Sequence, residues 1–107
     1  MHEDLVVEVS QVAIIVLKGE VDLAGIGDLQ DAIEPFLAPG QTVVMDLSAV
    51  TFADSTLLKV LAQARGRLSG AGGSLMVRNP SEQARRLLTM GELDDLVQDE
   101  ADRQNRR

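Results

Sequence analysis

The sequence contains no cysteine, no tryptophan and no tyrosine, and its one histidine is His2. Without cysteine there is no disulfide, no thiolate metal ligand and no cysteine nucleophile. With one histidine, close to the start of the chain, we expect neither a serine–histidine hydrolase site nor a histidine-rich metal site. The composition therefore predicts a protein that is not an enzyme and that uses no metal or other cofactor.

Positive charge is also scarce. Ten lysines and arginines stand against 17 aspartates and glutamates, which gives a net charge of -7. Nucleic acids and anionic membrane surfaces both require a basic face, so we expect neither as a partner. The longest apolar run, Val12–Leu17, is too short to cross a bilayer, and residues 1–4 are acidic where a secretory signal is basic. We therefore expect a cytoplasmic protein without direct membrane insertion.

The length and the apolar content predict one domain with an aliphatic core. The chain has 107 residues, of which 45% are hydrophobic but only 2% aromatic. This is enough for a single core and too little for two. We place the domain at residues 1–97 and expect residues 98–107, which are mostly polar and charged, to form a frayed tail.

Four segments have the apolar or β-branched pattern of strands. They are Leu5–Val9, Val12–Leu17, Val43–Leu47 and Ser74–Arg78. Ser10 and Gln11 separate the first two, which predicts a tight hairpin and an antiparallel pair. A short final element at Leu93–Val97 would be the last piece of regular structure.

Three segments have helical spacing. The first follows Asp22, a candidate N-cap, and ends or kinks at Pro35. The second begins near Asp54 or Ser55 and has one apolar stripe, formed by Leu57, Val60, Leu61, Ala64 and Leu68. The third is predicted to have Asn79 as its N-cap, Pro80 at its first position and Glu82 at its third, and to end at Gly91.

The predicted order is β-β-α-β-α-β-α. Its two β-α-β steps imply parallel neighbours, and the opening hairpin implies an antiparallel pair. The fold class is therefore α/β, with a small mixed β-sheet of four to five strands packed with three to four helices. Asp46 is expected to end the third strand and to hold the loop after it, while residues 70–73 form a turn.

With these elements placed, the chain resembles the STAS-domain family and, within it, the bacterial anti-sigma factor antagonists. Three segments support the resemblance, and they occur in the order that the family has. They are residues 19–22 (Gly-Glu-Val-Asp), residues 43–55 (Val-Val-Met-Asp-Leu-Ser-Ala-Val-Thr-Phe-Ala-Asp-Ser), and residues 77–81 (Val-Arg-Asn-Pro-Ser) followed by residues 87–93 (Leu-Leu-Thr-Met-Gly-Glu-Leu).

The resemblance implies a phosphorylation switch at Ser55. In the family, the serine after the aspartate is phosphorylated by the partner, an anti-sigma factor that is also a serine kinase, and a PP2C-type phosphatase reverses this. The unmodified form binds the anti-sigma factor and releases the sigma factor. The same resemblance suggests a partner-binding surface, with Thr56 as the alternative acceptor; it comprises Asp22, Asp54, Ser55, Thr56, Leu57 and Lys59.

The sequence departs from the family pattern just after Ser55. Leu57 and Lys59 stand where the family commonly has glycines. Two interpretations therefore stay open. In one, Ser55 is the switch; in the other, Ser55 and Thr56 only cap the helix, and the chain is a constitutive STAS subunit of a larger assembly, such as a lipid-transport ABC complex or a stress-signalling complex.

Overall fold

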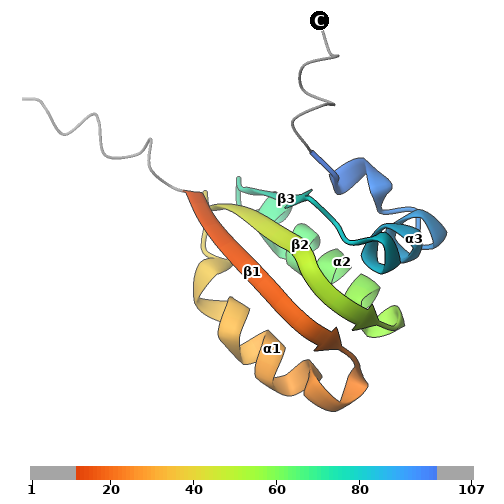
Figure 1. The fold of residues 1–107 in the computed structure, drawn as a ribbon. Helices are drawn as coiled ribbons and strands as arrows, with labels where there is room; N and C mark the ends of the chain where they lie inside the picture. Colours follow the sequence, from red (N-terminus) through yellow and green to blue (C-terminus); the bar gives the residue numbers. More distant parts are fainter. Residues whose placement is uncertain (1–11, 99–107) are drawn as a thin grey trace, which may run out of the picture.

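The fold is described from a computed structural model, which describes residues 12–98 (Figure 1). The predicted strand Leu5–Val9, the turn at Ser10 and Gln11, and residues 99–107 of the predicted tail lie outside this range. Gln98, the first residue of that tail, is held in place because its backbone N–H donates a hydrogen bond to the carbonyl of Val77, at 2.7 Å.

Strands and helices alternate along the described residues. The strands are β1 (Val12–Val21), β2 (Thr42–Ala53) and β3 (Ser74–Arg78), and the α-helices are α1 (Ile26–Ile33), α2 (Ser55–Gly70) and α3 (Glu82–Met90). Short 3-10 helices follow β1, α1 and α3; they are η2 (Leu23–Gly25), η3 (Glu34–Phe36) and η4 (Asp94–Leu96). Pro35 lies in η3, so α1 ends just before it, as predicted.

The three strands form one parallel sheet in the order β1-β2-β3. Ile14 lies opposite Val44, which in turn lies opposite Met76. The parallel neighbours agree with the two predicted β-α-β steps. The prediction of four to five strands in a mixed sheet is wrong for residues 12–98, where three strands occur and all are parallel.

The predicted element at Leu93–Val97 is mostly a helical turn, and this accounts for part of the difference. The N–H of Leu96 donates to the carbonyl of Leu93 at 3.0 Å, which closes the turn η4. Only Val97 reaches the sheet, where it forms an isolated parallel bridge with Val77. A segment that curls in this way offers too few extended residues for a further strand.

The sequence predicted strands at Val12–Leu17 and Val43–Leu47. Both strands, β1 and β2, extend beyond these predicted bounds. The pairing continues through two register shifts, between Val16 and Lys18 and between Gly19 and Glu20. Gly19 has a φ of 79°, a conformation that glycine adopts easily, and it stays paired with Val50; the extra residue at this shift, Thr51, is on β2. Gly19 therefore lies within β1, opposite a bulge of β2.

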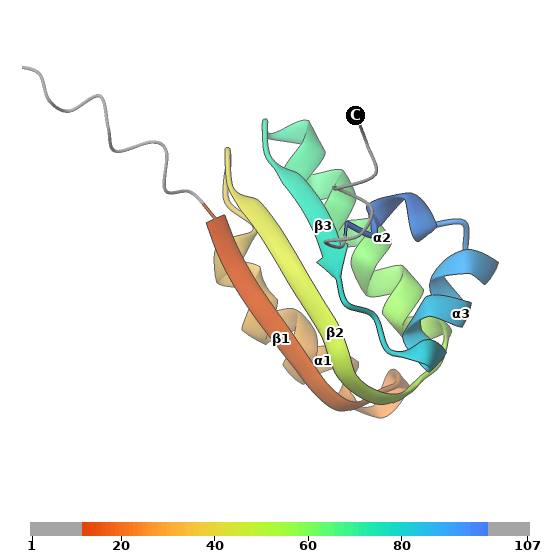
Figure 2. The same cartoon turned by 45° about the horizontal axis from the view of Figure 1, so that its top comes forward.

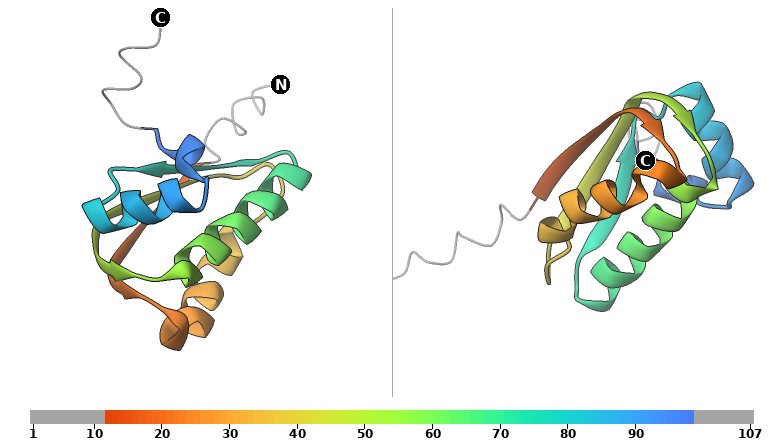
Figure 3. Two further views of the ribbon diagram at one scale, coloured as in Figure 1. Left: turned by 90° about the vertical axis from the view of Figure 1, so that its right-hand side faces the viewer. Right: turned by 90° about the horizontal axis from the view of Figure 1, so that it is seen from below.

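The core lies between the sheet and helices α1 and α2, which cover the same face of it (Figure 3). The predicted apolar stripe of α2 is confirmed, because its five side chains are all buried: Leu57, Val60, Leu61, Ala64 and Leu68. Helix α3 adds Ala84 and Leu88 to the same cluster. Neither phenylalanine belongs to this core, since Phe36 is 40% exposed and Phe52 is 48% exposed.

On the opposite face, β1 and β2 have no described helix over them (Figure 2). The row formed by Ile14, Val44 and Met76 lies on this face, and Val12 and Val16 lie on it beside Ile14. Val12, Ile14 and Val16 are between 47% and 56% exposed. The described residues therefore form a two-layer α/β arrangement.

The third helix begins two residues later than predicted, so Glu82 is its first residue and not its third. Ser81 is its N-cap, and the Ser81 hydroxyl accepts a hydrogen bond from the N–H of Ala84 at 3.2 Å. Asn79 has a φ of 51°, so it turns the chain before the helix, and Pro80 precedes the cap. The predicted roles of Asn79 as N-cap and Pro80 as first helical residue are therefore wrong, whereas Gly91 does end the helix.

Candidate functional site

The candidate site lies where β1 and β2 end and α2 begins. Val21 and Ala53 are opposite each other at these ends, and the N–H of Asp54 donates to the carbonyl of Val21 at 3.2 Å. Figure 2 shows the two strand ends side by side. This contact brings together the predicted residues on the first loop, Asp22, and on the second, Asp54 and Ser55.

Asp54 is the N-cap of α2, and Ser55 is the first helical residue. This agrees with the prediction that the helix begins near Asp54 or Ser55. Its carboxylate accepts a hydrogen bond from the N–H of Thr56 at 2.8 Å, and the backbone N–H of Leu23 also donates to it. These hydrogen bonds, those from Thr56 first, hold the pKa of Asp54 below its usual value. Asp54 is thus a charged cap that also ties the two loops together.

Ser55 and Thr56 have different surroundings, although both follow the cap. Ser55 is the first residue of α2 and is exposed, and its hydroxyl forms no hydrogen bond with any of residues 12–98. Thr56 is buried, with 8% of its surface exposed. The hydroxyl that a partner can reach is therefore that of Ser55, and the role of the helix cap is filled by Asp54.

Asp22 caps the short helix η2. Its carboxylate accepts a hydrogen bond from the N–H of Gly25 at 3.2 Å, so the predicted capping role is confirmed, although the helix directly capped is η2 and α1 follows it. The side chain of Asp22 is half-buried. The first turns of η2 and α2 therefore each have a carboxylate at the same edge of the sheet.

Comparison with known proteins identifies the family. Residues 5–98 match the family model described as "Mlab, STAS domain". The chain belongs to the STAS-domain family. No curated protein sequence matches it significantly.

Solved structures of other STAS proteins have the same fold. The anti-sigma factor antagonist SpoIIAA in its unphosphorylated form is 19% identical, with a TM-score of 0.73 over 90% of this chain and 86% of that one. The phosphorylated form of SpoIIAA from Bacillus is 19% identical, with a TM-score of 0.67 over 90% and 89%. A candidate anti-sigma factor antagonist from Thermotoga maritima is 23% identical, with a TM-score of 0.70 over 92% and 91%.

Leu57 and Lys59, which replace the glycines common in this family, differ in burial: the first is in the core of the STAS domain and the second is on its surface. Leu57 is fully buried, with 0% of its surface exposed, and belongs to the core. Its side chain therefore cannot be part of a contact surface, and the prediction that it binds a partner is corrected. Lys59 is exposed, so position 59 is where the departure from the family changes the surface.

Two apolar side chains that the sequence interpretation did not select lie at the same edge of the STAS domain. Leu23, whose N–H donates to Asp54, is 70% exposed, and Phe52, two residues before Asp54, is 48% exposed. Exposed aromatic and leucine side chains beside polar groups are common at protein–protein interfaces. The signal in the sequence was that Phe52 is one of only two aromatic residues.

Asp46 has a structural role within β2 and does not end the strand as predicted. Its carboxylate accepts hydrogen bonds from the N–H and the hydroxyl of Ser48, at 2.9 and 2.7 Å, and from Nε of Arg78 at 2.8 Å. The Ser48 hydroxyl contributes most to lowering the pKa of Asp46, which falls to about 2. The hydrogen bonds to Ser48 agree with the prediction that Asp46 holds the chain after it.

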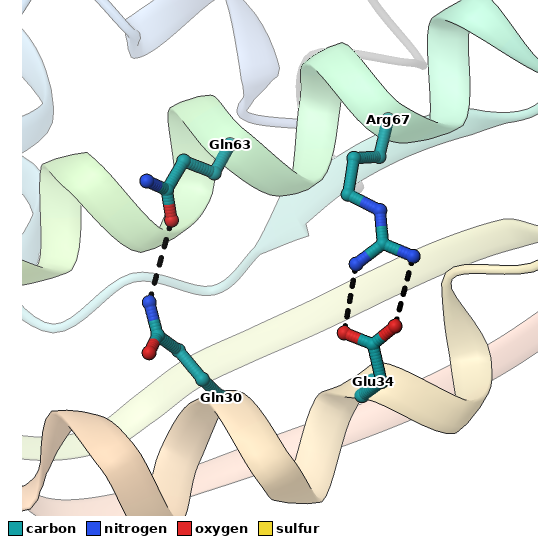
Figure 4. Close-up of polar contacts among 4 residues, drawn as sticks. All are labelled: Gln30, Glu34, Gln63 and Arg67. Atoms are coloured by element: carbon teal, nitrogen blue, oxygen red, sulfur yellow. Dashed lines mark hydrogen bonds and ion pairs between the residues drawn. The ribbon is translucent and has the colours of Figure 1, made fainter.

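A hollow lies between α1 and α2, with a volume of about 650 Å³. Figure 4 shows two polar bridges across it: Nε2 of Gln30 donates to Oε1 of Gln63 at 3.4 Å, and Arg67 forms two hydrogen bonds with Glu34, at 2.7 and 2.9 Å. Glu34 and Arg67 are 58% and 50% exposed, and pairs of this kind contribute little to stability. The hollow holds none of the predicted site residues.

Metal-ligand clusters and membrane-spanning helices are both absent from residues 12–98. No group of three or more histidine, cysteine, aspartate or glutamate side chains among residues 12–98 could hold a metal ion. Among the same residues, no helix is long and apolar enough to cross a membrane. The edge around Ser55, where the ends of β1 and β2 bring Asp22, Asp54 and Ser55 together, is the candidate functional site.

Proposed function

We propose that this STAS domain is an anti-sigma factor antagonist that docks onto a partner protein through the edge around Ser55. The observation that supports the proposal is that the Ser55 hydroxyl is exposed and has no hydrogen bond within the described residues. Because Asp54 already caps α2, the helix does not need Ser55 as a cap. The hydroxyl is thus available for modification without loss of the helix start.

The proposed partner is an anti-sigma factor that is also a serine kinase. It would contact the exposed side chains of Leu23 and Phe52 and the carboxylates of Asp22 and Asp54. The net charge of -7 favours a partner surface with basic groups around an apolar centre. Binding of the unmodified form would release the sigma factor.

Phosphorylation of Ser55 would oppose this binding if the part of the partner surface that faces Ser55 is apolar or acidic. A phosphate adds roughly -1.5 to -2 charges at pH 7, next to the two carboxylates of this edge. If docking places Ser55 against the apolar centre, the partner must also remove water from the phosphate. A loss of ~3 kcal/mol would weaken binding by about a hundredfold, which is enough for a switch. A PP2C-type phosphatase would restore the binding form.

The proposal is tested by using four proteins as bait in a lysate of the native organism. They are the wild type, Ser55→Ala, Ser55→Asp and, as control, Ser69→Asp, which adds the same charge at an exposed position in the last turn of α2. Thermal denaturation first establishes that all four are folded. We expect wild type, Ser55→Ala and the control to retain a kinase-like anti-sigma factor and Ser55→Asp to lose most of it.

Incubation of the retained kinase with ATP completes the test. Wild type should take up phosphate and Ser55→Ala should not. Equal capture of the anti-sigma factor by wild type and Ser55→Asp would contradict the switch at Ser55, and so would equal phosphate uptake by wild type and Ser55→Ala.

A second candidate function is a constitutive subunit of a larger assembly, such as a lipid-transport ABC complex. Two observations favour it: the matching family model has the description "Mlab, STAS domain", and Lys59 changes the surface where antagonists commonly have glycine. In this case the same edge docks permanently and no phosphate is needed. Capture of a transporter ATPase in equal amounts by wild type and Ser55→Asp would support this function over the switch.

A further inference from the structure

Lys59 is a cation on the same side of α2 as Ser55. Residues four apart in an α-helix are neighbours on its surface, with about 5–6 Å between their Cβ atoms. Both side chains are exposed, and α2 is regular from Ser55 to Gly70. The Lys59 ammonium group can therefore reach a group attached to the Ser55 oxygen without any change in the backbone.

Within residues 12–98, Lys59 has no ion-pair partner. The nearest acid in the sequence, Asp54, uses its carboxylate for the N–H groups of Thr56 and Leu23. Asp22 uses its carboxylate for the N–H of Gly25. The unmodified site thus contains two carboxylates with hydrogen-bond partners and one cation without a charged partner in the described residues.

We infer that Lys59 is the internal counter-ion of a phosphate on Ser55, and this inference rests on the proposed function. An acid at position i and a lysine at position i+4 is the favourable orientation of such a pair in a helix. The phosphate would also lie at the N-terminus of α2, the positive end of the helix dipole. Lys59 then partly balances the repulsion between the phosphate and Asp54.

The pair has a consequence for regulation of the same edge. In the unmodified form, Lys59 is free to meet an acidic group of the partner. Phosphorylation turns Lys59 toward Ser55 and so removes that contact, while the phosphate adds negative charge. Phosphorylation of Ser55 thus adds negative charge to the docking surface and also withdraws the positive charge of Lys59 from the partner. The second effect depends on Lys59, which replaces a glycine common in the family.

The test uses phosphoserine installed at position 55 during translation, so it requires neither the kinase nor the partner. Phosphorylated proteins with Lys59, with Lys59→Gln and with Lys18→Gln are compared; Lys18 is an exposed lysine on β1 and serves as the control. Titration of the phosphate by ³¹P NMR gives its second pKa in each protein. An i,i+4 pair should increase the acid dissociation constant by about twofold, and this increase should disappear in Lys59→Gln and at high salt.

Equal phosphate pKa values with Lys59 and with Lys59→Gln at low salt would overturn the inference, because the helix terminus alone would then account for any shift. A loss of the shift in Lys18→Gln as well would show a general charge effect and would also overturn it. Circular dichroism of the unphosphorylated variants establishes that the substitutions leave the fold intact. Failure of Ser55 to be phosphorylated by a kinase would contradict the proposed function but would leave this measurement unaffected.

Discussion

Replacement of Asp46 by asparagine should destabilise the STAS domain in a pH-dependent manner. The Asp46 carboxylate accepts three hydrogen bonds, two from Ser48 and one from Arg78, and it is 9% exposed. These contacts join the middle of β2 to the end of β3, where Asp46 and Arg78 are opposite each other. Asparagine keeps the shape of the side chain but removes the charge that the donors stabilise.

The size of the effect follows from the pKa of Asp46, which is lowered from 3.8 to about 2. One pKa unit corresponds to about 1.4 kcal/mol, so the charged form is favoured in the folded state by roughly 2 kcal/mol. Arg78 is 39% exposed, and solvent screens its share of the interaction. We therefore expect Asp46→Asn to lower the free energy of unfolding by about 1–2 kcal/mol at pH 7.

The pH dependence has a definite sign. Because the pKa is lower in the folded state, the stabilisation is complete above the ordinary pKa of 3.8 and is lost as the pH falls toward about 2. Urea denaturation followed by circular dichroism at several pH values between 7 and 2 measures this for wild type, Asp46→Asn and the control Asp31→Asn, an exposed position on α1. The reasoning is refuted if Asp46→Asn is as stable as wild type at pH 7, or if its deficit does not shrink at acid pH.

Four further substitutions test the packing by the midpoint of urea denaturation. Gly73→Ala would place a Cβ atom 2.1 Å from the carbonyl oxygen of Gln41, so we expect a loss of at least about 1–3 kcal/mol; Gly66→Ala, with no atom within 4 Å, should instead stabilise α2 by about 0.5–1 kcal/mol. Leu57→Ala should cost about 2–5 kcal/mol, and an unchanged midpoint would show that this side chain lies outside the core. Ser81→Ala should cost about 1 kcal/mol through loss of the cap of α3, and a neutral effect would contradict that assignment.

The parts of the fold that follow from local patterns could be predicted from the sequence. β3 has the bounds that its apolar residues indicated, Ser74–Arg78, and the stripe of α2 lies in the core because every third or fourth residue is aliphatic. The start of α2 was predictable to within one residue, since Asp54 and Ser55 are both good capping residues, and Asp54 is the one that caps the helix.

Other parts depend on contacts between distant segments, which no local pattern encodes. β1 continues through Gly19 because its pairing with β2 resumes after the bulge at Thr51, and the residues around Gly19 alone could not show this. Ser81 became the cap of α3 because its N–H donates to Leu47 on β2, at 3.0 Å, and this fixes where the helix begins. Asn79, also a good capping residue, was indistinguishable from Ser81 in the sequence.

The candidate site was predictable in its polar residues and not in its apolar ones. Asp22, Asp54 and Ser55 lie together because the strands that precede them are parallel neighbours, and their order in the sequence indicated this. The burial of Leu57 and the exposure of Leu23 depend on how α2 and η2 are rotated against the sheet. Hydrophobicity alone does not say which leucine faces the core and which faces a partner.

The exclusion of both phenylalanines from the core has a consequence for spectroscopy. The chain has no tryptophan and no tyrosine, so it has almost no intrinsic fluorescence of its own. Phe52 is 48% exposed beside the Ser55 edge, and Phe36 is 40% exposed after α1. A tryptophan in place of Phe52 would be a single emitter at the proposed docking surface, and one in place of Phe36 would be a matched emitter elsewhere. The Phe52→Trp variant would report binding of the partner, the Phe36→Trp variant would serve as its control, and neither change would touch the aliphatic core.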